Sequence, residues 1–122
     1  MAEFAEPREQ TGFEMTQALL ARPDRPDAIL TSNGLLLLGA FQALSKSGLR
    51  CPDDVALAGF DNAKWTQLVS PGLTVVEQPT YEIGRTAAEL LLGRLVNPGR
   101  SSRCVTLPHR LVVRGSTLRV SE

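Results

Sequence analysis

The chain has 122 residues, 43% of them hydrophobic and 21% charged, which is typical of a single globular domain. Its 13 basic and 13 acidic residues cancel, so the sequence lacks the basic excess of a domain that binds nucleic acid through phosphates. No apolar run approaches the roughly 20 residues that span a bilayer. Residues 1–10 form a polar tail without the apolar core of a secretory signal. We therefore expect a cytoplasmic protein that contacts neither DNA nor membrane directly.

Metal, cofactor and nucleophile chemistry have little support in the sequence. Cys51 and Cys104 lie far apart, which favours free thiols over a disulfide in a chain without a secretory signal. The single histidine, His109, follows Pro108 in a polar turn, so a zinc site would have too few ligands. Neither a glycine-rich phosphate loop nor a G-x-S-x-G elbow is present. We expect no metal, no cofactor and no enzymatic activity.

The first half of the chain alternates helix and strand. A helix begins at Thr11 and stops at the two prolines of residues 21–26, which cannot continue it. Residues 28–30 are too short for a helix and predict a buried strand. Residues 35–47 predict a second helix, which Gly48 closes. This order is the start of an α/β pattern.

The helix over residues 35–47 is apolar on two faces, which indicates two packing partners. We assign one stripe to the sheet and the other to a second cover. The sheet-facing stripe is Leu36, Ala40, Ala43 and Leu44, and the second stripe is Leu35, Leu38 and Phe41.

The second half continues the alternation. The expected elements are a strand over 55–58 that Gly59 ends, a surface helix over 63–69, a strand over 73–76, a helix over 80–96 with Pro79 at its first position, and strands over 104–107 and 111–113. The helix over 80–96 carries the clearest apolar stripe, made of Ile83, Ala87, Leu90, Leu91 and Leu95. Strands that alternate with helices predict a parallel α/β sheet with right-handed crossovers.

Asn33 and Asp61 are the candidate ligand contacts. Each follows the carboxyl end of a predicted buried strand, where open α/β sheets hold their ligands. An amide that donates and accepts, beside a carboxylate that only accepts, suits the vicinal hydroxyls of a sugar-like molecule. The alternative is structural, with Asn33 (or Ser32) capping the following helix and Asp61 beginning another.

Four blocks of sequence resemble, in order and spacing, the carboxyl-terminal part of LacI/GalR-type transcriptional regulators. They are residues 26–40 (PDAILTSNG…LGA), 48–61 (GLRCPDDVALAGFD), 71–84 (PGLTVVEQPTYEIG) and 107–117 (LPHRLVVRGST). The resemblance implies part of a periplasmic-binding-protein-like type I fold, with residues 11–122 forming mostly one three-layer α/β lobe of a two-lobed effector-binding core. The helix over 80–96 resembles one that belongs to the other lobe. The DNA-binding domain of that family has no counterpart in this chain.

The resemblance also implies roles for individual residues. The family's effector contacts correspond to Asn33 and Asp61, with a more variable contact near Gln78 and Thr80. One departure concerns Gly34, where the family commonly has an aspartate. This difference weakens any inference about which effector is bound.

Self-association is the second implied role. In such regulators the carboxyl-terminal lobe contributes to a homodimer interface. The corresponding residues here are Leu38, Phe41, Trp65, Leu68 and Val69. Their apolar and aromatic character fits an interface core, and simple core packing is the alternative.

The function implied by the resemblance is sensing of a sugar-like effector, which controls an absent helix-turn-helix allosterically through a dimer. We expect the chain alone not to bind operator DNA and to bind sugar weakly or not at all. A periplasmic solute-binding protein of the same fold is the alternative. An enzyme would need a partner for Asp61, and the sequence offers none.

Overall fold

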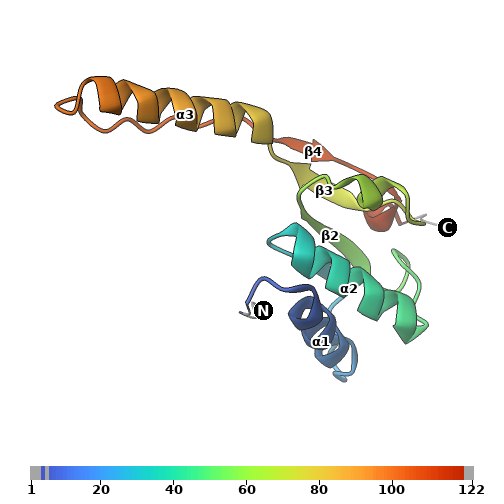
Figure 1. Cartoon of the computed structure of the whole chain (residues 1–122). Helices are drawn as coiled ribbons and strands as arrows, with labels where there is room; N and C mark the ends of the chain where they lie inside the picture. The colour runs from blue at the N-terminus through green and yellow to red at the C-terminus, as the bar shows by residue number, and fades with distance from the viewer. Residues whose placement is uncertain (1–3, 5, 120–122) are drawn as a thin grey trace. The chain divides into compact units, whose positions relative to one another are not determined.

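The computed structural model describes residue 4 and residues 6–119, and the chain divides into two compact units. The first unit comprises the chain up to Glu77 together with the chain from Leu111 onward, and the second unit is Gln78–Arg110. The elements in chain order are α1 (Glu9–Leu20), β1 (Ala28–Leu30), α2 (Gly34–Ser47), β2 (Ala56–Phe60), the 3₁₀ turn η1 (Lys64–Gln67), β3 (Thr74–Glu77), α3 (Thr80–Val96), β4 (Arg110–Val112) and the 3₁₀ turn η2 (Gly115–Thr117) (Figure 1).

The strands form one sheet in the order β1-β2-β3-β4. β1 pairs with β2 and β2 pairs with β3, both in parallel, with Ala28 opposite Ala56 and Ala58 opposite Thr74. In parallel pairs of this kind the carboxyl ends of the strands lie at one edge of the sheet. The predicted parallel α/β fold is therefore confirmed.

Helix α2 supplies the helical side of the core. The side-chain oxygen of Asn33 caps its first turn, and Gly48 ends it in the left-handed conformation with φ 77°, as predicted. The fully buried core consists of Leu37, Ala40, Leu44, Val55, Leu57, Leu73 and Val75. Leu37 thus takes the sheet-facing position that we assigned to Leu36, because the face that carries Leu36 lies against α1.

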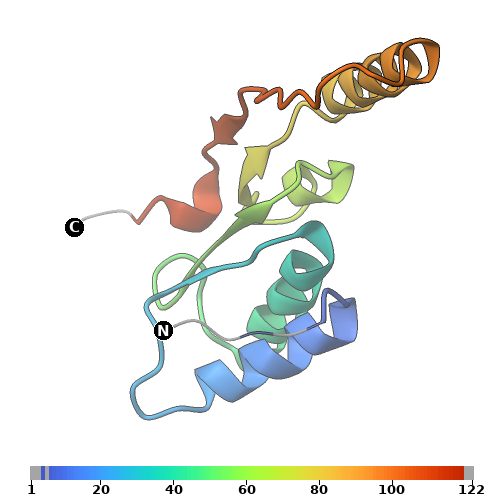
Figure 2. The same ribbon diagram turned by 90° about the vertical axis from the view of Figure 1, so that its left-hand side faces the viewer.

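Helices α1 and α2 pack side by side with their backbones in close approach (Figure 2). A Cβ atom placed on Gly12 would lie 2.5 Å from the carbonyl oxygen of Leu36. One placed on Gly39 would lie 2.5 Å from the backbone nitrogen of Phe13 and would also collide with the carbonyl of Glu9. The two glycines therefore permit a helix contact that any other residue would hold apart.

Two strands differ from expectation. β2 runs on through Gly59 to Phe60, because Gly59 is a packing position rather than a terminator: a Cβ there would lie 2.6 Å from the hydroxyl of Thr31. β1 is not the buried strand we expected. Leu30 is 69% exposed, because β1 is an edge strand that pairs only with β2 among the described residues.

Several boundaries also shift. The first helix begins at Glu9 rather than Thr11, so the expected tail is shorter, and its residues 1–3 and 5 lie outside the described residues. The expected helix over 63–69 is the 3₁₀ turn η1, and Pro79 precedes α3 as its N-cap. The strand expected over 104–107 is absent, since those residues have no neighbouring strand, while β4 forms over Arg110–Val112.

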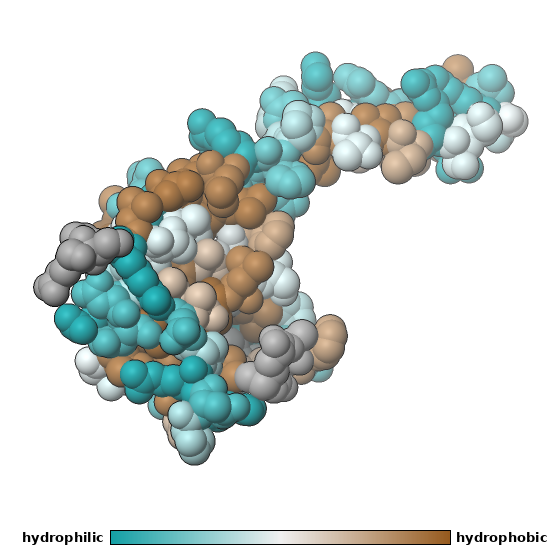
Figure 3. Space-filling model, turned by 180° about the vertical axis from the view of Figure 1, so that it is seen from behind, coloured by the Kyte–Doolittle hydropathy of each residue, from teal (hydrophilic) through white to brown (hydrophobic). Residues whose placement is uncertain are grey.

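The second unit contains α3, whose bounds match the prediction. None of its residues is buried, although it carries the predicted apolar stripe. Leu91, Leu92 and Leu95 are 60%, 60% and 69% exposed, and apolar side chains lie at the surface of this part of the chain (Figure 3). In the described part of the chain, no helix is both long and apolar enough to cross a membrane.

Candidate functional site

The amino-terminal end of α2 brings Asn33 and Asp61 to the same place. Asn33 follows β1 by three residues, and its Oδ1 accepts hydrogen bonds from the backbone N–H groups of Leu35 and Leu36, each at 3.0 Å. Asp61 follows β2 directly, and its Oδ2 accepts from the N–H of Gly34 at 3.1 Å. Both side chains thus meet the same helix end at the carboxyl rim of the sheet.

The backbone of Asp61 has an unusual conformation. Its φ of 74° is the one positive value among the described non-glycine residues. Aspartate tolerates this left-handed region better than most residues. Its N–H donates to the carbonyl oxygen of Val76 at 3.0 Å, which extends the contact between β2 and β3 past the end of β2. The turn directs the carboxylate toward the N–H of Gly34 at the amino-terminal end of α2, where negative charge is favourable.

This geometry leaves hydrogen-bonding capacity for a ligand. The capping bonds of Asn33 use its carbonyl oxygen and leave the amide nitrogen as a donor. A carboxylate offers about four acceptor positions, and Oδ2 of Asp61 uses one of them for the N–H of Gly34. The structural role foreseen for Asn33, helix capping, is observed. The roles of Asn33 and Asp61 as ligand contacts stay predictions.

Gly34 leaves space beside Asp61. A Cβ atom at Gly34 would lie 3.5 Å from both the Cβ and the Oδ2 of Asp61, which is an ordinary contact distance. The glycine is therefore not required sterically. As a glycine it places no second side-chain carboxylate beside Asp61.

Gln78 and Thr80 belong to the second unit. Gln78 is exposed and follows β3, and its carbonyl oxygen accepts from the N–H of Thr80, the first residue of α3, at 2.9 Å. They are not grouped with Asn33 and Asp61 within one unit. Their predicted role in effector binding stays a prediction.

Sequence reasoning missed a polar cluster next to Asp61. Asn62, Thr66, Glu77 and Arg114 are joined by side-chain hydrogen bonds of 2.7–3.2 Å. Arg114 lies in the block 107–117 that carried the family resemblance, but no spacing rule pairs it with residue 62. Only the folded chain reveals this link.

The residues predicted to form a dimer interface have mixed surroundings. Phe41, Trp65 and Val69 pack partly against the core, and the rings of Phe41 and Trp65 are 6.1 Å apart. Leu68 is 72% exposed, whereas Leu38 is partly buried. Core packing therefore accounts for part of this group and leaves Leu68 unexplained.

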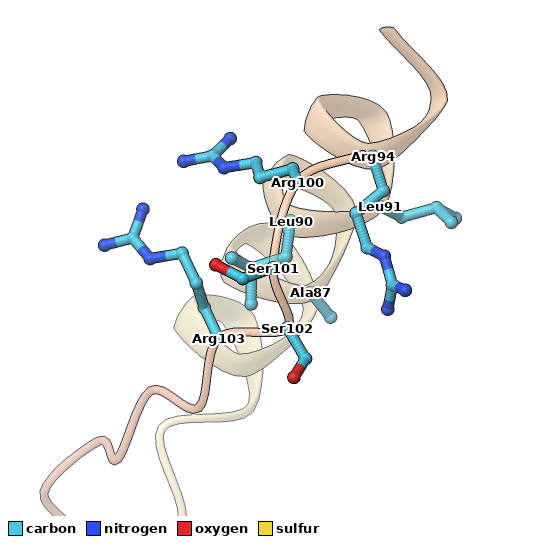
Figure 4. A pocket seen from close by; sticks show the side chains of 8 residues that line it. All are labelled: Ala87, Leu90, Leu91, Arg94, Arg100, Ser101, Ser102 and Arg103. Carbon is cyan, nitrogen blue, oxygen red and sulfur yellow. The ribbon is translucent and has the colours of Figure 1, made fainter. Parts of the chain in front are cut away.

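Two hollows are lined by neither Asn33 nor Asp61. A largely apolar groove of about 500 Å³ between α1 and β1 is lined by residues that include Met15, Leu30 and Thr31, whose buried hydroxyl has no hydrogen-bond partner. A second hollow of about 350 Å³ in the second unit is lined by Arg94, Arg100 and Arg103 (Figure 4). The guanidinium groups of Arg100 and Arg103 extend to one side and that of Arg94 to the other, so they do not converge on one anion.

Ionisable groups elsewhere have structural roles. Hydrogen bonds from Arg50 hold the pKa of Asp54 below its usual value, and the pair closes the turn before β2. Burial raises the pKa of the Cys51 thiol. Among the described residues, no group of three or more histidine, cysteine, aspartate or glutamate side chains could hold a metal ion.

A family model described as a periplasmic binding protein-like domain matches residues 2–117. The HTH-type transcriptional regulator KdgR of Bacillus subtilis (strain 168) is 34% identical over 109 residues, which cover 89% of this chain and 32% of KdgR. The chain thus spans about a third of the length of the curated relatives it matches. These relatives are transcriptional regulators or repressors of the HTH type.

Solved structures of LacI-type regulators are also similar to this chain. A LacI family regulator from Arthrobacter sp. FB24, in complex with lactose, is 40% identical with a TM-score of 0.78, over 93% of this chain and 42% of that one. The lac repressor dimer bound to operator and the anti-inducer ONPF is 31% identical with a TM-score of 0.80, over 92% of this chain and 34% of that one.

Proposed function

Since the chain belongs to the periplasmic binding protein-like family, in the form carried by LacI-type transcriptional regulators, we propose that it senses a sugar-like effector and controls DNA binding allosterically. The observation that carries the proposal is the meeting of Asn33 and Asp61 at the amino-terminal end of α2. In this proposal a separate helix-turn-helix binds the DNA, and the regulator acts in the cytoplasm.

The chemistry of the rim supports a polyhydroxylated ligand. The Asn33 amide nitrogen can donate to one hydroxyl oxygen while Asp61 accepts from neighbouring hydroxyls. Hydrogen bonds to an ionised group are stronger than neutral ones, so Asp61 makes the larger contribution. The lactose-bound relative, at 40% identity, favours a sugar as the ligand class. Gln78 and Thr80 are proposed as further contacts from the second unit.

Paired variants separate ligand binding from helix capping. Asn33→Asp retains an oxygen that caps α2 but loses the amide donor, and Asp61→Asn retains an acceptor for Gly34 but loses the charge. We expect the free energy of unfolding of both variants to lie within about 1 kcal/mol of the wild-type value. The weak lactose affinity of the chain, measured from nitrogen-15 chemical shifts during a titration, should fall about tenfold in Asn33→Asp and more in Asp61→Asn.

Gly34→Ala is the matched control for these variants. The added methyl group fits beside Asp61 and alters no hydrogen-bonding group, so sugar affinity should stay within about twofold of the wild type. Equal sugar affinity in wild type and Asp61→Asn would contradict the proposed role of the rim. A panel of other mono- and disaccharides tests the ligand class.

We also propose that the surface around Leu68 mediates homodimerisation, as the family resemblance implies. Leu68 is 72% exposed beside the partly buried Trp65 and Val69. Light scattering after size exclusion should report a dimer for the wild type and a monomer for Leu68→Asp. Val105→Asp, at another exposed apolar residue, is the control and should not change the mass. An unchanged dimer in Leu68→Asp would contradict this interface.

A further inference from the structure

Arg114 connects three separate segments of the first unit. It lies between β4 and η2, and its partly buried guanidinium donates to three oxygens. Nη1 donates to the carbonyl of Leu73 at 2.8 Å and to the hydroxyl of Thr66 at 3.2 Å, and Nη2 donates to Oδ1 of Asn62 at 2.7 Å. A planar guanidinium can hold such a set of acceptors in fixed directions, which an ammonium group cannot.

Asn62 extends this link to Glu77. While its Oδ1 accepts from Arg114, its Nδ2 donates to Oε1 of Glu77 at 2.7 Å. Both ends of the amide are therefore engaged, one toward a cation and one toward a carboxylate. The side chain has one orientation that satisfies both, and this restrains the backbone next to Asp61.

The link joins the two points where the chain passes between its units. Glu77 is the last residue before the second unit begins at Gln78, and Arg114 follows shortly after the chain re-enters the first unit at Leu111. Asn62, the direct neighbour of Asp61, is hydrogen-bonded to both Glu77 and Arg114. A left-handed conformation such as that of Asp61, with φ 74°, persists only where its surroundings hold it.

We propose that Arg114 and Asn62 are positioning residues, which hold the left-handed turn at Asp61 through the Arg114–Asn62–Glu77 link and so aim its carboxylate at α2 and at the effector. The inference rests on the proposed function where it concerns the effector.

The backbone N–H of Gly34 reports this direction without any ligand, because it donates to Asp61 Oδ2. We expect Arg114→Gln to shift the Gly34 and Asp61 amide resonances in nitrogen-15 spectra of the full chain. The Gly34 amide should also exchange with solvent about tenfold faster. Arg119→Gln is the control, since Arg119 donates to the backbone carbonyls of Pro52 and Asp27 but not to Asn62, and it should leave Gly34 unchanged.

A second variant keeps the test decisive if Arg114→Gln does not fold. Asn62→Asp retains an acceptor for Arg114 but loses the donor to Glu77, and it should shift Gly34 in the same direction by a smaller amount. Gly34 resonances and exchange in a folded variant that match those of Arg119→Gln would overturn the inference.

Lactose titrations separate this inference from the proposed function. Loss of lactose binding in Asp61→Asn, with neither Gly34 nor lactose affinity altered by Asn62→Asp, would overturn the positioning role and leave the proposed function standing. A Gly34 response in a chain whose lactose affinity does not depend on Asp61 would support the positioning role and contradict the proposed function.

Discussion

The two units use the same kind of helix with opposite results. α2 buries Leu37, Ala40 and Leu44 against the sheet, whereas α3, with an equally clear apolar stripe, buries no residue. Leu91 and Leu95 of α3 stay 60% and 69% exposed. An amphipathic period therefore shows that a helix has an apolar face, but not where the partner for that face is found. The described residues supply the partner of α2 and not that of α3.

The largest expected effect is the difference between Leu37→Ala and Leu91→Ala. Leu37 is fully buried, so its truncation should lower the free energy of unfolding by about 3 kcal/mol. Leu91 is mostly exposed, and its truncation should change that free energy by less than about 0.5 kcal/mol. Urea unfolding followed by circular dichroism, which reports the helices of both units, measures both. Similar losses in the two variants would mean that α3 is covered in solution.

The same contrast applies to glycines within the two helices. Gly39→Ala would force its methyl group into the backbone of α1, and we expect a loss of about 2–3 kcal/mol. Gly84→Ala faces open space in α3 and should gain up to about 1 kcal/mol of helix stability, since alanine loses less backbone entropy. Circular dichroism during thermal unfolding tests both. A stable Gly39→Ala variant would show that α1 and α2 are farther apart than described.

The sequence predicted the α/β order because periodicity and turn residues are local properties. Asn33 as a cap, Gly48 as a helix end and the bounds of α3 were all foreseen, and each depends on residues within one turn. Errors arose where packing between segments decides. Gly59 packs against the side chains of Thr31 and Leu37, which are distant in sequence. Leu36 lies against α1 rather than the sheet, and Leu30 lies in the edge strand β1.

The candidate site likewise contains residues that the sequence predicted and a hydrogen-bonded link that it did not predict. Its two rim residues could be named from the sequence, because each follows a strand end. The Arg114–Asn62–Glu77 link could not, because residues 52 positions apart meet only in the folded chain. A single sequence contains no signal for such a pair.

The two cysteines offer a smaller contrast between the units. Cys51 is partly buried, its Sγ lies 3.7 Å from the carbonyl oxygen of Ser116, and burial raises the pKa of its thiol. Cys104, in the second unit, is exposed. Because the thiolate is the reactive form, alkylation by iodoacetamide near neutral pH should modify Cys104 several-fold faster. Mass spectrometry over time identifies the order, and faster labelling of Cys51 would contradict the described packing.

The smallest expected effect concerns exposed ion pairs. Arg50 lowers the pKa of Asp54, so the pair contributes stability above the unfolded pKa of about 3.9 and loses it as pH falls through the lower folded pKa. Asp54→Asn lacks this pair, so its unfolding midpoint should fall less than the wild-type midpoint as the pH is lowered. Glu89→Gln, which removes the longer 3.9 Å pair of α3, should leave the midpoint unchanged. A midpoint of Asp54→Asn that follows the wild type at every pH would exclude this role.

The most direct test of the central claim is a lactose titration of the nitrogen-15-labelled chain that maps which backbone amides move. We predict weak, saturable shifts concentrated at Asn33, Gly34 and Asp61, since the rim at the amino-terminal end of α2 is the proposed contact. Shifts confined to the arginine-lined hollow of the second unit, or no shifts near α2 at saturating lactose, would contradict the account.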